Sequence, residues 1–401
     1  MYEGVEIPVR IAWPVARELL QRLVLEGTIL SPRVVDKPLA LYGAGNLGRM
    51  AREYFDRLGV PVQCFIDANA ASLRDDPYWD GVRLLSPQEV PMDLRNSFLL
   101  AVCVVTSPYA ALSRHLQETG WNDVVPFYDI AEGFRHRHPL SNGWFAPPLT
   151  PSEITHMETV LKTWSDDTSR AHHLQFIAWR RLRQEWRFDA APITIDDRFF
   201  IPEVMAALTD DESFVDVGAH TGSVTKRFID AMNGRFRRIW AIEPDARSLI
   251  DLNAAVAEEA PEVRQRIEII PAVIASDGNG RKFLGGLGYA SQCCDLGALA
   301  PSHTLDEPGL TPTYIKLHLE GLELEVLHGA IATITRHRPI IAATCYHNAD
   351  GLYALPLWLM DHLPGYHFHF RQHSWCGTGS VVYCIPDSVN ALGVKSIKEI
   401  A

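Results

Sequence analysis

The chain has 401 residues, of which 47% are hydrophobic and 21% charged, so it holds enough apolar material for two or three globular domains. Its formal net charge of −12 argues against a surface built for the phosphate backbone, and we expect no nucleic-acid partner. The longest apolar run, residues 98–105, is too short to cross a bilayer, and the cysteines lack CxxC spacing, so we expect a cytoplasmic protein with free thiols and no membrane partner.

A glycine-rich turn lies at the centre of the first predicted unit. A strand over residues 39–42 precedes Gly43, Gly45 and Gly48, a helix follows, and a second strand ends at Asp67, about 20 residues after the last glycine. Such glycines let a diphosphate approach the backbone, the helix N-terminus attracts an anion, and the acid suits ribose hydroxyls. These four residues are predicted to form a second nucleotide site. The alternative is that the glycines serve only the turn.

This segment resembles the small Rossmann-like domain that precedes some sugar-modifying enzymes, which leaves NAD and a sugar nucleotide both open as its ligand. No residues typical of hydride transfer follow it, so a dehydrogenase is poorly supported.

A proline-rich break at residues 145–151 separates the two units. Apolar residues at spacings of three and four predict a helix from about Ser152 to Arg187. Its arginines are interpreted as a solvated helix face, with a polyanion-binding patch as the alternative. They are Arg180, Arg181, Arg183 and Arg187.

The second unit begins with a strand over residues 213–217 that carries Asp216 and leads into a small-residue turn. A second strand ends in Glu243 and Pro244, and further strands are predicted at 267–275, 314–319 and 339–345. A helix is predicted at about 322–336, after the strand at 314–319. The carboxylate of Asp216 can bind an ammonium group or orient the turn, and the glycines of that turn let a nucleoside approach the backbone. The carboxylate of Glu243 can accept hydrogen bonds from both ribose hydroxyls. S-adenosylmethionine carries all of these groups in one molecule.

Residues 196–386 resemble the FkbM-like family of class I S-adenosylmethionine-dependent methyltransferases. The segments VDVGAHTGSVT, AIEPDARSLIDLNAAV, IIPAVIASDGNGRKF and YIKLHLEGLELEVLHGA carry the resemblance in order. His220 stands where Asn or Gly is common, and His318 stands where an acid is expected. The expected cofactor-binding residues are Asp216, Gly218, Ala219, His220, Gly222, Glu243, Pro244, Ala272 and Asp277.

The expected fold class is α/β, with two doubly wound Rossmann-like domains joined by a helical linker. Residues 1–140 are predicted to form the N-terminal Rossmann-like domain, 141–195 the linker, and 196–401 the methyltransferase domain.

Lys316, His318 and Glu320 are the predicted catalytic residues. An alcohol acceptor loses its proton during attack, and an imidazole that titrates near neutrality suits that task. Glu320 is expected to orient His318 or to act as the base itself, and a purely structural His318 is the alternative. The predicted function is O-methylation of a sugar, glycan or secondary-metabolite hydroxyl, so the expected partner is a small-molecule or glycan acceptor. A catalytically silent protein that binds through its N-terminal nucleotide or sugar-nucleotide site is the alternative function.

A metal site is a weaker interpretation of the C-terminal histidines. His367 and His369 share one face of a predicted strand, and with His347 or Glu320 they offer ligands for a divalent ion. A strand with one buried face explains the pattern as well, so no metal ligand is predicted.

Overall fold

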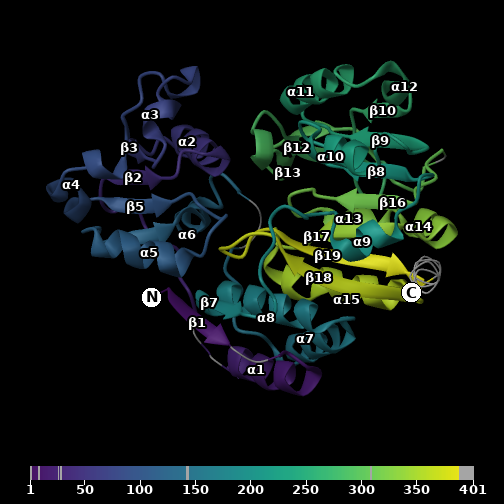
Figure 1. Cartoon of the computed structure of the whole chain (residues 1–401), viewed down its shortest axis with the longest axis horizontal. Helices are drawn as coiled ribbons and strands as arrows, with labels where there is room; N and C mark the ends of the chain where they lie inside the picture. The colour runs from purple at the N-terminus through teal and green to yellow at the C-terminus, as the bar shows by residue number, and fades with distance from the viewer. Residues whose placement is uncertain are drawn as a thin grey trace, which may run out of the picture.

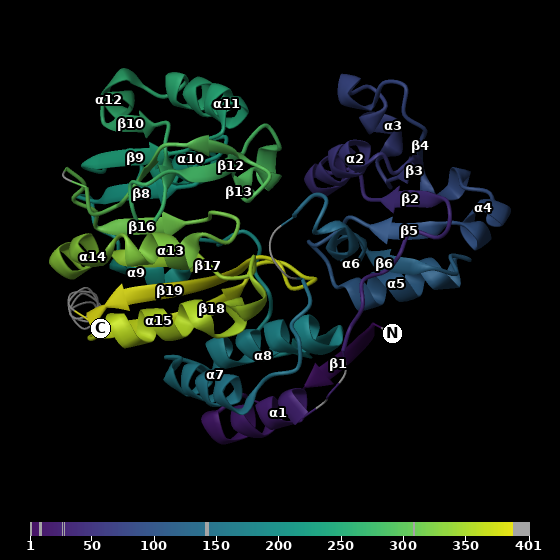
Figure 2. The same ribbon diagram turned by 180° about the vertical axis from the view of Figure 1, so that it is seen from behind.

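The computed structural model describes residues 2–7, 10–25, 27, 29–140, 144–307 and 309–387. Two α/β units lie side by side with a helical layer along one edge, as Figure 1 and the reverse view in Figure 2 show. Each unit is built on a sheet with a parallel core, and the predicted α/β class is confirmed.

The N-terminal unit is a parallel sheet with helices on its faces. Within the described residues its strand order is β4-β3-β2-β5-β6. The strands are β2 (Leu39–Tyr42), β3 (Val62–Ile66), β4 (Leu84–Leu85), β5 (Leu99–Val102) and β6 (Val124–Pro126). The helices are α2 (Asn46–Leu58), α3 (Ala70–Leu73), α4 (Met92–Ser97), α5 (Tyr109–Glu118) and α6 (Phe127–Ala131). Strands β2 and β5 are almost wholly apolar and buried, as expected for a sheet covered on both faces.

The first 25 residues pack with the helical layer. Strand β1 (Glu3–Ile7) pairs in parallel with β7 (Gln184–Phe188), and α1 (Trp13–Leu25) packs on α7 (Pro151–Thr163) and α8 (Asp167–Leu182). The predicted boundary of 1–140 assigned this segment to the N-terminal domain. The other end of that range adjoins residues 141–143, which lie outside the described residues.

The helical stretch predicted for residues 152–187 is confirmed in most of its length, but it is divided into two helices and its last residues form a strand. The chain turns after α7, and Asp166 starts α8 by accepting a hydrogen bond of 2.6 Å from the backbone N–H of Ser169. Helix α8 ends at Arg183, which adopts a left-handed conformation with φ of 56°, and β7 follows directly.

The interpretation of the linker arginines as a solvated face is wrong for three of the four. Arg180 and Arg181 are fully buried and Arg183 is 4% exposed, whereas Arg187 lies at the surface beside Glu6. Buried guanidinium groups need partners. Arg180 donates to the carbonyl oxygen of Tyr346 at 2.9 Å. Helical spacing alone could not reveal this, because the acceptors come from a distant loop.

The C-terminal unit contains, within the described residues, a sheet in the order β10-β9-β8-β16-β17-β19-β18. Its strands are β8 (Ser213–Val217), β9 (Arg238–Ile242), β10 (Ile267–Ile270), β16 (Tyr314–Leu317), β17 (Ile340–Thr344), β18 (Tyr366–Gln372) and β19 (Ser380–Pro386). Its helices are α9 (Pro202–Ala207), α10 (Ser223–Ala231), α11 (Ala246–Ala257), α12 (Pro261–Arg264), α13 (Glu323–His328), α14 (Ile331–His337) and α15 (Ala354–His362). Strand β19 runs antiparallel to β17 and β18, and the other pairs are parallel. The carboxyl ends of β8, β9 and β16 therefore meet at one edge, where open α/β sheets bind ligands.

Two predicted elements of this unit are divided. The strand expected at 267–275 splits at Pro271, which cannot donate to a ladder, and β11 (Val273–Ile274) pairs with β15 (Ser302–His303) instead. The helix expected after β16 divides into α13 and α14 at Gly329. A Cβ there would lie 2.5 Å from the carbonyl oxygen of Ala275, so only glycine fits.

A small antiparallel sheet connects the two units. It consists of β12 (Arg281–Leu284), β13 (Gln292–Cys293) and β14 (Ala298–Ala300), and its β12–β13 end approaches α2 in Figure 1. Leu287 and Ala290, in the loop between β12 and β13, belong to the hydrophobic core of the N-terminal unit. The side-chain amide of Gln292 donates to the carbonyl oxygen of Pro139 at 2.9 Å.

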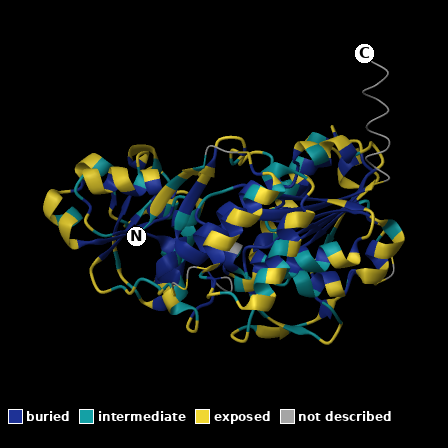
Figure 3. Ribbon diagram, turned by 90° about the horizontal axis from the view of Figure 1, so that it is seen from below, coloured by how far each residue is buried: buried dark blue, intermediate teal, exposed yellow. Residues whose placement is uncertain are grey.

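Burial follows the layers: the central strands of both sheets are buried, and the outer helix faces are exposed (Figure 3). None of the helices in the described ranges combines the length and the apolar character needed to span a bilayer. All seven cysteines are described and none is in a disulfide. The cytoplasmic location stays a prediction.

Candidate functional site

A cavity opens where β8, β9 and β16 end. Strand ends and the turn after β8 contribute one wall, and the β12–β13 loop contributes another. The predicted residues that line it are Gly218, Glu243, Pro244, Ala272, His318 and Glu320. Four further residues line it that were not predicted as site residues: Phe283, Ser291, Gln292 and Cys293. They come from β12, β13 and the loop between these strands, and this loop packs against the N-terminal unit.

Glu243 is the carboxylate of this cavity. It is 6% exposed, and its two oxygens accept hydrogen bonds from the backbone N–H groups of Asp245 (2.9 Å) and His220 (2.8 Å). Burial raises its pKa, although these hydrogen bonds oppose the effect. Each carboxylate oxygen has more than one lone pair, so both oxygens retain capacity for a ligand hydroxyl.

The turn after β8 needs its glycines. Gly218 has a φ of 76°, and a Cβ at this position would lie 2.0 Å from the carbonyl oxygen of His318. Gly222 has a φ of 85° and precedes α10. Between them Ala219 is buried, and His220 adopts a φ of 50° while its N–H serves Glu243. The turn thereby aligns Glu243 and fixes the approach of β16.

Asp216 and Lys316 form a fully buried ion pair on neighbouring strands. Lys316 Nζ lies 2.8 Å from Asp216 Oδ1 and donates to the carbonyl oxygen of Gly218 at 2.8 Å, and Thr225 donates to Asp216 Oδ2 at 2.7 Å. Neither charged residue is among the described residues that line the cavity. Their geometry indicates that the pair holds β8, β16 and the glycine turn together.

Asp277 also lies away from the described lining of the cavity. It forms an ion pair with Arg281 at 3.0 Å on the outside of the molecule. A cofactor contact by Asp216 or Asp277 therefore stays a prediction that the packing does not favour.

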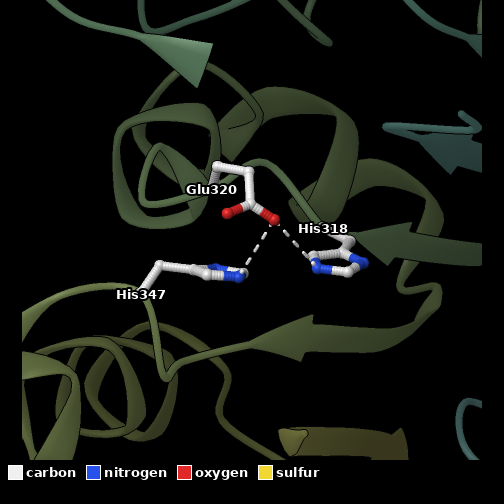
Figure 4. A group of neighbouring side chains, drawn as sticks. All are labelled: His318, Glu320 and His347. Carbon is white, nitrogen blue, oxygen red and sulfur yellow. Dashed lines mark ion pairs between the residues drawn. The ribbon is translucent and has the colours of Figure 1, made fainter. Parts of the chain in front are cut away.

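Three side chains meet at the end of β16 and β17. Glu320 Oε1 lies 3.4 Å from His318 Nε2 and 3.2 Å from His347 Nε2, and Figure 4 shows the two imidazoles on either side of this oxygen. Glu320 adopts a φ of 50°, which turns the chain after β16. The sequence predicted His318 and Glu320 together, but His347 joins them from the neighbouring strand.

Glu323 holds this cluster from behind. Its Oε1 accepts from Thr344 at 2.6 Å and lies 2.9 Å from His347 Nδ1. It also accepts the backbone N–H groups of Leu319 at 2.9 Å and Gly321 at 3.0 Å. Sequence reasoning missed Glu323, because an acid in the first turn of α13 is typical of any helix start. Its function depends on pairing with a strand further along the chain.

The cluster has a distinct charge distribution. Burial lowers the pKa of His318 to about 3. Burial opposes charge on Glu320 and His347 as well, but their mutual attraction outweighs it: the pKa of Glu320 falls, and that of His347 rises well above its ordinary value. His318 is therefore neutral at physiological pH, in contrast to the near-neutral titration expected from sequence.

A second cavity of about 600 Å³ lies between the two units. His318, Glu320 and His347 line it from the C-terminal unit, and His318 and Glu320 also line the first cavity. Apolar side chains cover much of its wall, including Met50 and Trp144. The two cavities thus adjoin at His318 and Glu320.

The predicted N-terminal nucleotide site faces the same cavity. Gly43, Gly45 and Asp67 line it, and a Cβ on Gly45 would meet no atom within 4 Å. Gly48 has a packing role, since a Cβ there would lie 2.1 Å from the carbonyl oxygen of Gly43. Asp67 accepts a hydrogen bond of 2.7 Å from the N–H of Ala44, so it supports the turn directly.

The C-terminal histidines considered as metal ligands are engaged elsewhere. His369 Nδ1 lies 2.6 Å from Asp166 Oδ2, and Arg371 lies 2.9 Å from the same oxygen and 2.6 Å from Glu203. The guanidinium thus occupies the position of a cation in this group. Burial would raise the pKa of Asp166, but the hydrogen bonds from His369 and Arg371 outweigh it and hold the pKa well below its ordinary value.

No protein-family profile and no curated protein match the sequence. Among solved structures, the methyltransferase FkbM from Methylobacillus flagellatus KT is similar over 92% of this chain and 92% of its own, with 17% identity and a TM-score of 0.57. The precorrin-6y C5,15-methyltransferase from Geobacter metallireducens GS-15 matches 49% of this chain and 93% of its own, with 18% identity and a TM-score of 0.29. Methyltransferase PaMTH1 from Podospora anserina matches 64% of this chain and 93% of its own, with 11% identity and a TM-score of 0.27. The first similarity spans both units, and the sequence resemblance to FkbM-like methyltransferases is confirmed at the level of the fold.

Proposed function

We propose that this protein is an FkbM-like methyltransferase that uses S-adenosylmethionine to methylate a hydroxyl group of a small molecule or glycan. The observation that carries the proposal is the junction of two cavities at His318 and Glu320. One cavity has the strand-end carboxylate that a ribose needs, and the other has room for an acceptor of about 600 Å³.

The first cavity measures about 50 Å³ in this structure, so the cofactor would have to widen it, but the residues that line it suit the groups of the cofactor. Glu243 retains acceptor capacity on both oxygens for two ribose hydroxyls, and Ile242, Phe283 and Leu322 give apolar contact for an adenine ring. When bound, S-adenosylmethionine supplies a methyl group on a positively charged sulfur that is ready for displacement. The protein's main tasks are then to align the acceptor and exclude water.

The acceptor hydroxyl is proposed to lie against His318 and Glu320. Its oxygen forms a bond to the methyl carbon as the bond between carbon and sulfur breaks, and the electron pair stays on sulfur. The hydroxyl becomes strongly acidic as the new bond forms, so the weakly basic His318–Glu320 pair suffices to take its proton. Lys316, buried against Asp216, acts in this account by holding the strands in place.

The Gly43–Gly48 turn is proposed to hold the nucleotide part of the acceptor. It shares the larger cavity with His318, which favours a sugar nucleotide as acceptor over NAD as a second cofactor. The start of α2 has Gly45 as its N-cap with no side-chain cap, which suits a phosphate group.

Calorimetric titration with S-adenosylmethionine and S-adenosylhomocysteine tests the proposal, followed by transfer of a labelled methyl group to a panel of free sugars and sugar nucleotides. We expect both nucleosides to bind and the label to reach a hydroxyl. A folded protein that binds neither nucleoside contradicts the proposal. Tight binding of a sugar nucleotide without methyl transfer would support the silent binding protein instead.

A further inference from the structure

The cluster of His318, Glu320 and His347 has the composition of a metal site. One ligand atom from each residue lies within 4.8 Å of the others. Ligand atoms that share an ion at about 2.1 Å lie about 3.0–3.4 Å from one another in tetrahedral or octahedral geometry. Two of the three separations, 3.2 Å and 3.4 Å from Glu320 Oε1, match that requirement, and the third, between the two imidazole nitrogens, is within 4.8 Å.

The support behind His347 is also typical of a metal ligand. Histidines that bind a metal donate their other ring N–H to a carboxylate or carbonyl, which fixes the ring. His347 Nδ1 lies 2.9 Å from Glu323 Oε1, which is itself held by Thr344. The imidazole is 2% exposed, and its Nε2 lies toward Glu320 without a hydrogen bond of acceptable geometry.

The Nε2 atom of His318 carries a lone pair at the same cluster. Arg198 donates to the hydroxyl oxygen of Tyr346 at 3.1 Å, so the hydrogen of Tyr346 points elsewhere. His318 Nε2 lies 3.2 Å from that hydroxyl and is the acceptor it meets. An unprotonated nitrogen is what a metal ligand requires. A bound ion replaces this hydrogen bond and also displaces the proton from Nε2 of His347, because metal binding releases ligand protons.

We propose that His318, Glu320 and His347 form a divalent-metal site of two imidazoles and one carboxylate at the junction of the two cavities. Imidazole ligands favour first-row transition ions such as Zn²⁺, Mn²⁺, Fe²⁺ or Co²⁺ over Mg²⁺. Three protein ligands leave coordination positions open toward the larger cavity, where an acceptor hydroxyl can bind. With an ion bound, His318 and Glu320 act as ligands, so the ion acidifies the hydroxyl and its proton leaves to water in place of transfer to this pair. That role rests on the proposed methyl transfer, whereas the site itself does not.

Titration of the chelator-treated full chain with Co²⁺ alone tests the site, with neither nucleoside nor acceptor present. We expect one Co²⁺ per chain with visible absorption bands, displaced by Zn²⁺ and not by an equal concentration of Mg²⁺. His318→Gln and Glu320→Gln should each weaken binding by about 10-fold or more, and Glu323→Gln by about 10-fold through loss of the support of His347. His369→Gln, in the other histidine–carboxylate group, should leave binding unchanged, because Arg371 already occupies that position.

Anomalous diffraction from wild-type crystals soaked in Co²⁺ locates the ion without any variant. A peak within coordination distance of the three side chains is the expected result. Absence of stoichiometric Co²⁺ binding by the folded protein, a peak elsewhere, or equal binding by both ligand variants overturns the metal site. Methyl transfer that proceeds fully in the metal-free protein refutes the ion's role in transfer alone.

Discussion

Replacement of Glu243 should separate cofactor affinity from folding. In Glu243→Ala the carboxylate is lost, and each charge-assisted hydrogen bond to a ribose hydroxyl contributes about 1.5–3 kcal/mol. Loss of even one of the two proposed bonds weakens the affinity for S-adenosylhomocysteine roughly 10- to 150-fold, so this range is the smallest effect expected. Calorimetry gives the dissociation constant, and circular dichroism with thermal unfolding shows whether the variant is folded.

The same replacement leaves two buried N–H groups, those of His220 and Asp245, without their carboxylate. We therefore expect stability to fall by about 1–3 kcal/mol as well. Glu268→Ala is the matched control, since this acid lies exposed on the neighbouring strand β10 and pairs only with Arg238 among the described residues. It should keep full affinity.

The affinity should also depend on pH. Burial raises the pKa of Glu243, so its ionised form is lost at a higher pH than that of an ordinary glutamate as the solution is acidified. Affinity for S-adenosylhomocysteine should therefore fall on acidification while the protein is still folded. Unchanged affinity in a folded Glu243→Ala variant would refute the assignment of this carboxylate to the ribose.

Three further experiments, with five replacements, test the turn, the buried arginine and the acid that starts α8. Gly218→Ala should destabilise the fold by about 3 kcal/mol in urea unfolding, because its Cβ would overlap a carbonyl oxygen. Gly45→Ala has open space around its Cβ and should not destabilise the fold. Equal effects of the two replacements would contradict the steric role of Gly218. Arg180→Met should lower the free energy of unfolding by about 3 kcal/mol, and Arg187→Met by less than about 0.5 kcal/mol, because only Arg180 is buried. The reverse order would show that Arg180 is not the buried arginine. Asp166→Asn should cost about 2 kcal/mol at pH 7. The pKa of Asp166 is lower in the folded protein than in the unfolded chain, where it is about 3.9. The ionised carboxylate therefore stabilises the fold at higher pH, and this contribution is lost as the pH falls toward the folded-state pKa. The unfolding free energies of the wild-type and Asp166→Asn proteins should thus converge in acid.

Local pattern sufficed for the strand-end motifs. Apolar strands are followed by glycines at 218 and 222 and by an acid at 243, the spacing typical of a turn through which a ligand approaches the backbone. The structure places Gly218 and Glu243 at one cavity. The same logic identified His318 and Glu320, which are two residues apart on one segment. Features whose chemistry depends on neighbours in sequence were therefore predictable.

Features made by distant segments were not. Asp216 was expected to bind a ligand, but in the structure it pairs with Lys316. The pair forms because β8 and β16 are neighbouring strands with these two residues in register, and that pairing was not predicted from either strand alone. Glu323 and His347 likewise meet only after β17 is placed beside β16. Single-segment periodicity contains no information on such pairings.

A crystal structure with S-adenosylhomocysteine would show where the nucleoside binds. We expect it at the ends of β8 and β9 with its ribose hydroxyls on Glu243 and its sulfur toward the space beside His318 and Glu320. A nucleoside bound at the N-terminal glycine turn, or a cavity beside Glu243 that stays closed to a saturating ligand, would contradict this expectation.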